Sequence, residues 1–165
     1  MNFNFNAAEV FDIAVQIEEN GKRFYDRSRQ IVEDPGVQKL FEDLGQAEVK
    51  HRETFLSLKS QLPTSAASGG VFDPNDELSL YIKMMADQHV FISGGDIQAR
   101  LAQIKNSVDA LKMAIEFEKD TVIFFLSMQD ATDSARGKEF IGSLVREEME
   151  HLRRLSVELK RIGRK

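Results

Sequence analysis

The chain has 165 residues, of which 42% are hydrophobic and 30% are charged, and its formal net charge is −5. This balance is typical of a folded globular protein, and the length predicts one domain covering 1–165 with a single core. Basic side chains are interspersed with acidic ones, so we expect no nucleic-acid partner. The absence of cysteine excludes disulfides, zinc ribbons, iron–sulfur clusters and thiol catalysis.

The sequence also predicts a cytoplasmic location with no membrane partner. Its first residues contain neither a basic region nor a long apolar run, so we expect no signal peptide. The longest apolar stretch, 122–126, is far shorter than the roughly 20 residues that a membrane-spanning helix needs.

Hydrophobic positions at helical spacing predict two long helices in the first half of the chain. The first covers 7–31, with Asn6 as its N-cap and Glu9 as the partner in a capping box. The second covers 35–62, with Asp34 as its N-cap and a proline in the first turn, where proline is tolerated.

A long crossover is predicted over 63–106. It contains a short extra helix at about 74–88, after which Ser93–Gly95 interrupts the helical pattern. His89 lies in this crossover and is interpreted as a packing or surface histidine, with an accessory ligand or proton relay as the alternative.

Two more long helices are predicted over 107–130 and 134–161, the first of them with a possible N-terminal extension over 97–105. Two long helices, a long connection and two further long helices predict an all-α, four-helix bundle. One long crossover between the helix pairs is the ferritin-like topology, in which metal sites are built from side chains that point inward.

The two halves of the chain show a weak internal repeat at an offset of 100 residues. Overall identity between the halves is low, but the matches include residues that can do chemistry. Each of these residues lies on a helix face that is otherwise apolar or small, at steps of three and four residues. The matched pairs are Glu18 with Glu118, Glu48 with Glu148, and His51 with His151.

Small residues flank the two lone carboxylates, one helical turn away on either side. They are Ala14 and Gly21 beside Glu18, with Ala114 and Thr121 in the second half, and they would leave room for metal ions and a small ligand. Tyr25 lies two turns beyond Glu18 on the same face and could hydrogen-bond into the site. Its counterpart in the repeat is phenylalanine, so the two halves are chemically unequal.

A core that holds four carboxylates and two imidazoles needs compensating charge. Even with both histidines protonated the set keeps a net charge of −2, whereas buried charges are normally paired or bound to metal. Two divalent cations would resolve the deficit, and oxygen ligands with one imidazole per ion suit iron or manganese. By symmetry Glu48 and Glu148 would bridge two ions, Glu18 and His51 would serve one, and Glu118 and His151 the other, although the sequence leaves the pairing across helices open.

The alternative to a metal site is a set of buried Glu–His hydrogen bonds without metal. Four neighbouring acids are interpreted as solvated, because the other half of the repeat has no acid at their positions. These four are Glu19, Glu116, Glu147 and Glu150, opposite Lys119, Gln16, Ala47 and Lys50.

This constellation resembles the rubrerythrin and ferritin-like di-iron superfamily over nearly the whole chain, and most closely its short rubrerythrin-like members. The resemblance implies two iron ions, with manganese or zinc as substitutes, a homodimer, and a reaction with hydrogen peroxide or dioxygen. Tyr25 matches a tyrosine that this family has near the site. The chain lacks the four cysteines of a rubredoxin centre, and Thr121 stands where the family has an additional glutamate.

The leading functional hypothesis is a redox-active di-iron protein that oxidises Fe(II) or reduces peroxide or dioxygen with electrons from an external donor. Two alternatives remain open at this point. The chain could be an iron-storage or ferroxidase subunit of a larger assembly, or a bundle whose metal ions are purely structural.

Overall fold

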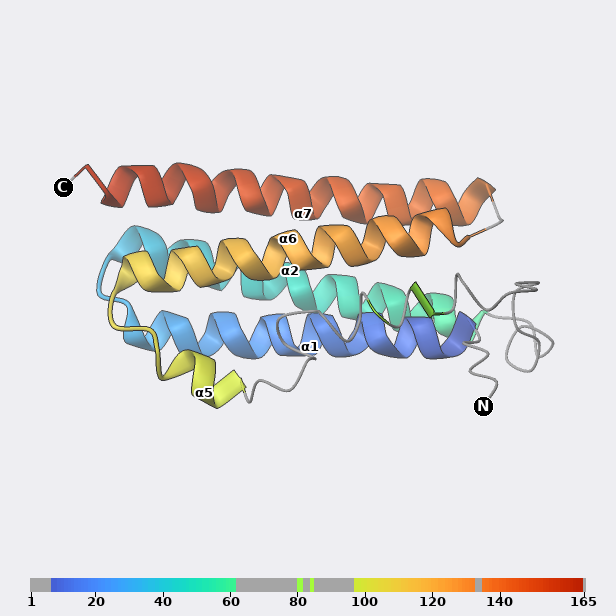
Figure 1. The fold of residues 1–165 in the computed structure, drawn as a ribbon, viewed down its shortest axis with the longest axis horizontal. Coiled ribbons are helices and arrows are strands. Elements are labelled where there is room, and N and C mark those ends of the chain that lie inside the picture. Colours follow the sequence, from blue (N-terminus) through green and yellow to red (C-terminus); the bar gives the residue numbers. More distant parts are fainter. Residues whose placement is uncertain (1–6, 62–79, 82–83, 85–96, 133–134, 165) are drawn as a thin grey trace.

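The computed structural model describes residues 7–61, 80–81, 84, 97–132 and 135–164. Its main feature is a bundle of four long helices that lie side by side along one axis (Figure 1). Their ends lie within two residues of the predicted bounds, and the predicted all-α class is confirmed. None of the described helices is both long and apolar enough to cross a bilayer. The four are α1 (Ala7–Ile31), α2 (Pro35–Ser60), α6 (Ser107–Asp130) and α7 (Ala135–Ile162).

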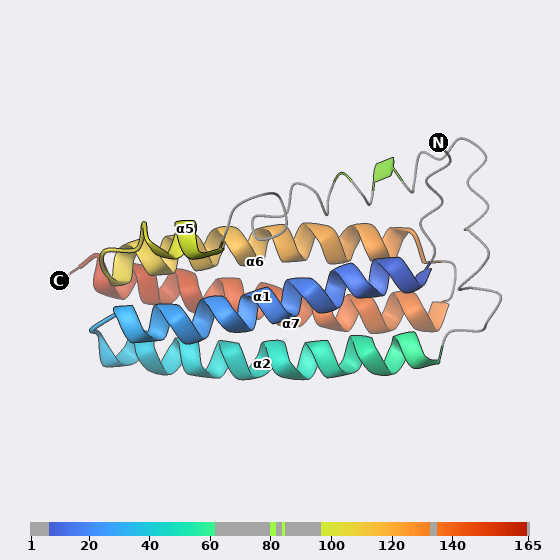
Figure 2. The same cartoon turned by 90° about the horizontal axis from the view of Figure 1, so that it is seen from below.

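The helices form two antiparallel pairs, α1 with α2 and α6 with α7, which then pack against each other (Figures 1 and 2). The end of α2 and the start of α6 lie at opposite ends of the bundle, as the predicted long crossover requires. The predicted extra helix at 74–88 lies mostly outside the described residues, and His89 lies outside them entirely.

Side-chain caps fix the beginnings of two of the long helices. The Asp34 carboxylate accepts hydrogen bonds from the backbone N–H groups of Gly36 and Val37, at 2.9 and 3.2 Å, as the sequence predicts for an N-cap. Asn106 caps α6 in the same way. Asn6, the predicted cap of α1, lies outside the described residues.

A short separate helix, α5 (Ile97–Leu101), precedes α6 and contacts α1. The sequence left open whether this segment extends the third long helix. It does not, because the chain turns after Leu101 and Asn106 starts a new helix. The Asn106 backbone is extended, with φ −160° and ψ 176°, and its side chain satisfies the N–H groups that a continuous helix would have bonded internally.

Aromatic rings pack in two groups on either side of the middle of the bundle. In one group, the Phe55 ring centroid lies 6.2 Å from that of Phe11 and 5.1 Å from that of Phe125. In the other, the Tyr25 and Phe41 centroids are 5.4 Å apart. Phe41 and Phe55 each lie about two helical turns from the centre of α2. The rings thus close off both ends of the middle layer from water.

Helices α1, α2 and α6 approach each other closely at Gly21. A Cβ atom on Gly21 would lie 2.5 Å from Cζ of the Phe117 ring and 3.3 Å from Cδ of Glu48. The sequence predicted open room for a small ligand here. Instead, the Phe117 ring and the Glu48 carboxylate occupy the space beside Gly21, and the glycine sets how near they come to α1.

We expect Gly21→Ala to lower the free energy of unfolding by about 1–2 kcal/mol, because overpacking a buried contact outweighs the better helix propensity of alanine. The matched control is Gly142→Ala in α7. There the added Cβ would come too close only to Nε2 of Gln129, at 2.5 Å and at the end of a flexible side chain, and its next neighbours lie at 3.6 Å or more. Urea denaturation of both variants checks the prediction, and equal stability would show that the Phe117 ring moves aside freely.

Candidate metal centre

All six predicted site residues meet in the middle layer of the bundle. Each long helix contributes: α1 and α6 one glutamate each, and α2 and α7 a glutamate and a histidine three residues later. Three or four residues make about one turn, so the glutamate and histidine of each Glu-x-x-His pair share one face. All six side chains are buried, the most exposed at 6%. They are Glu18, Glu48, His51, Glu118, Glu148 and His151.

The side chains form two overlapping groups, in each of which the candidate ligand atoms lie within 4.8 Å of one another. Glu48 and Glu148 belong to both groups, as expected for two bridging carboxylates. Glu18 and His51 complete one group, and Glu118 and His151 complete the other. The geometry thus gives the pairing across helices that the sequence left open.

Glu148 lies between the two imidazoles. Its Oε1 is 2.7 Å from Nδ1 of His51, and its Oε2 is 2.9 Å from Nδ1 of His151. The lone carboxylates lie slightly farther from the same nitrogens, with Glu18 3.6 Å from His51 and Glu118 3.5 Å from His151. The two imidazole rings are stacked at a centroid distance of 5.7 Å and 19° between planes. Both rings therefore direct Nδ1 toward the carboxylates.

Among the described residues, ten buried side-chain atoms make no well-aligned hydrogen bond, and nine of them belong to the six site residues, including the Nδ1 atoms that lie close to Glu148. Buried polar groups are normally satisfied, because an unpaired one costs about 1–3 kcal/mol. Here the unpaired oxygens and nitrogens converge, and their donor set of carboxylates with one imidazole per group suits iron, manganese or zinc. The arrangement therefore fits two metal ions, one in each group.

The pKa shifts of the site residues also indicate that the cluster needs positive charge. Burial raises the pKa of Glu18 and of Glu48 well above the ordinary value, and the charges of Glu118 and Glu148 raise both further, whereas the bond between Glu18 and Glu48 lowers the pKa of Glu18. Burial and the neighbouring Glu148 raise the pKa of Glu118 to about 8. Without metal ions, protons therefore take over part of the compensation that this concentration of negative charge requires.

The imidazoles respond in the opposite sense to burial. Burial alone would lower the pKa of His51 and of His151, but contacts with the carboxylates outweigh it and raise both to about 10. Although burial would raise the pKa of Glu148, its contacts with both imidazoles hold it well below its usual range. The metal-free site thus has a central carboxylate between two imidazolium rings.

We expect the metal-free protein to lose stability as the pH rises from about 5.5 to about 8.5, by about 2 kcal/mol or more. In this range folded Glu118, His51 and His151 keep protons that the unfolded chain releases, so rising pH favours unfolding. The lowered pKa of Glu148 matters only in acid, below about pH 4.5. Urea midpoints at the two pH values check this, and Glu118→Gln should flatten the dependence. A higher midpoint at pH 8.5 would contradict the electrostatic account.

Tyr25 contacts the cluster as the sequence predicted it could. Its buried hydroxyl donates a hydrogen bond to Oε1 of Glu118, which comes from the other helix pair. Burial, with the neighbouring carboxylates, raises the pKa of Tyr25 well above its ordinary value, so the phenol keeps its proton. Phe125, its counterpart in the repeat, packs against Phe55 instead.

The contact between Glu147 and His51 was not predicted from the sequence. The Glu147 side chain is 60% exposed, as expected of a solvated residue, but its Oε2 lies 3.1 Å from Nε2 of His51. The repeat argued against a role, because Ala47 occupies the equivalent position, and the contact crosses between helices. By contrast, Glu150 is exposed, as predicted, and forms an ion pair with Arg153.

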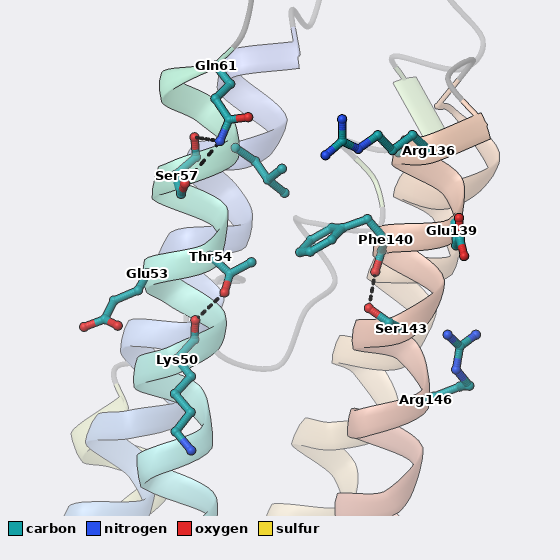
Figure 3. A pocket seen from close by; sticks show the side chains of 12 residues that line it. Lys50, Glu53, Thr54, Ser57, Gln61, Arg136, Glu139, Phe140, Ser143 and Arg146 are labelled. Carbon is teal, nitrogen blue, oxygen red and sulfur yellow. Dashed lines mark hydrogen bonds between the residues drawn. The ribbon is translucent and has the colours of Figure 1, made fainter.

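An open pocket of about 950 Å³ lies beside the cluster, between the second half of α2 and the first half of α7. Arg136 and Phe140 extend from α7 toward α2, and Lys50 and Arg146 lie at the end nearer the cluster (Figure 3). These two cations directly precede His51 and Glu147 in the sequence. The pocket adjoins the buried site without including any of its six residues.

No protein-family model and no curated protein sequence matches the chain. Among solved structures, one from Thermotoga maritima, provisionally described as a ferritin-like diiron-carboxylate protein, is similar over 98% of both chains. The TM-score is 0.73 and the sequence identity is 21%. The chain therefore has the ferritin-like fold, and the predicted ferritin-like four-helix bundle is confirmed.

Proposed function

We propose that this chain is a rubrerythrin-like, non-haem di-iron protein that reacts with hydrogen peroxide or dioxygen. The observation that carries the proposal is the convergence of buried carboxylate and imidazole atoms in two groups that share Glu48 and Glu148. The fold match with a protein described as a diiron-carboxylate protein supports it.

The ligand assignment follows the two groups. Glu18 and His51 would hold one ion, and Glu118 and His151 the other, with Glu48 and Glu148 between them. Iron is the proposed occupant, and the same oxygen and imidazole donors would accept manganese or zinc.

Two ferrous ions held there would supply the two electrons that, with two protons, convert one hydrogen peroxide to two water molecules. The chain's own residues provide the surroundings for this chemistry. The aromatic groups around Phe41 and Phe55 exclude bulk water from the middle layer. The Tyr25 hydroxyl keeps a proton beside the cluster, at an oxygen of Glu118.

Two partners belong to the proposal. An external electron donor would return the site to its reduced state, since the chain has no cysteines for a rubredoxin-type centre. A second copy of the chain would form a homodimer, for which the exposed Ile123 and Leu126 on α6 offer an apolar face.

The first test is metal content. Protein purified without added metal should carry about two iron or manganese ions per chain by elemental analysis. The double variant Glu48→Gln, Glu148→Gln should lose them, because both shared carboxylates are removed while side-chain shape is kept. Glu150→Gln, at an exposed position away from the site, is the matched control. No metal in the wild type would overturn the proposal.

A second test measures reactivity and assembly on protein that has been loaded with Fe(II) in the absence of oxygen. Stopped-flow absorbance should show oxidation on mixing with peroxide or dioxygen, and light scattering should report a dimer. A closed high-order oligomer would instead favour iron storage. A sample with two ions that neither oxidant changes would assign the metals a structural role.

A further inference from the structure

The two imidazoles of the cluster differ on their outer side. Nε2 of His51 lies 3.1 Å from Oε2 of Glu147, a carboxylate from the opposite helix pair. Among the residues that the structure describes, no carboxylate accepts a hydrogen bond from Nε2 of His151. The repeat explains the difference, because the residue equivalent to Glu147 is Ala47, whose methyl group cannot accept a hydrogen bond.

We propose that Glu147 is a positioning residue for His51 and makes the Glu18–His51 position the tighter and first-filled of the two metal positions. The inference rests on the proposed function, since it presumes that the cluster binds metal. A carboxylate that accepts the outer N–H of an imidazole fixes its tautomer and ring orientation and makes the inner nitrogen a stronger ligand. Nδ1 of His51 is that inner nitrogen, 2.7 Å from the shared Glu148.

The other half of the cluster carries the opposite bias. The Tyr25 hydroxyl donates to Oε1 of Glu118, so one oxygen of that carboxylate shares its negative charge with a proton donor before any ion arrives. Among the described residues no hydroxyl group bonds to Glu18, whose side chain contacts the Glu48 carboxyl group and lies 3.6 Å from Nδ1 of His51. Both differences between the halves therefore favour the Glu18–His51 position.

The contact lies where it can be altered without disturbing the core. Glu147 is on the surface of α7, with 60% of its side chain exposed, whereas His51 is 3% exposed. Loss of an outer hydrogen-bond partner typically weakens metal affinity by about 10–100-fold, and the exposure of Glu147 places the expected effect near the lower limit.

The test is calorimetric titration of the metal-free protein with Co(II). The wild type should bind in two steps, and Glu147→Ala should weaken the tighter step about 10-fold and leave the weaker one unchanged. Glu147→Gln keeps an acceptor oxygen and should restore part of the loss. In the converse variant, Ala47→Glu should strengthen the weaker step by giving His151 a partner.

Two further readouts separate positioning from general effects on the fold. In ¹H–¹⁵N spectra of the Zn(II)-loaded protein, one histidine Nε2–H should be protected from exchange in the wild type and lost in Glu147→Ala. Glu150→Ala, on the same helix and paired with Arg153, should change neither the spectra nor the titration.

The outcomes are distinct. Two Co(II) ions bound with both steps unchanged in Glu147→Ala, or with both weakened equally, would overturn the role of Glu147 and leave the metal site standing. A wild type that binds no Co(II) would overturn the proposed function and this inference together.

Discussion

The mutual repulsion of four buried carboxylates is the constraint on which the rest of this structure depends. The two imidazoles cannot neutralise the set, and in the described part of the chain no arginine, lysine or hydroxyl group pairs with Glu18 or Glu48. A core of this kind is costly by itself, yet buried aromatic rings pack on both sides of it. The negative charge of the four carboxylates is fully compensated only if cations bind between them. Burial of the carboxylates in the bundle core therefore favours the binding of metal ions.

The bundle topology brings these groups together from only one or two residues of each long helix. A Glu-x-x-His pair in each of α2 and α7 presents two ligands on one face, and a single glutamate in α1 and in α6 completes each group. The approximate repeat makes the halves similar but not identical. Tyr25 on Glu118 and Glu147 on His51 are two contacts without a described counterpart in the other half, and both lie just outside the cluster. Any functional difference between the two positions should originate there.

Much of this could be predicted from sequence because the signals are local. Helical periodicity gives the four long helices, and a shared face gives the six site residues, since both follow from steps of three and four residues. The contact between Glu147 and His51 could not be found in this way, because it joins two helices and breaks the repeat that otherwise served as a guide. The break between α5 and α6, a point that the sequence left open, and the filled space at Gly21 were not predicted for a related reason. They depend on a turn and on a ring from another helix, and neither appears in the periodicity of a single segment.

The most direct measurement of the central claim is anomalous diffraction at the iron edge from crystals of the Fe(II)-loaded protein. Two peaks should appear in the middle layer, about 3.5–4 Å apart, with Glu48 and Glu148 contacting both. One peak should lie beside Glu18 and His51, and the other beside Glu118 and His151. The absence of anomalous signal at the cluster, with the carboxylates still in contact with one another, would contradict the account.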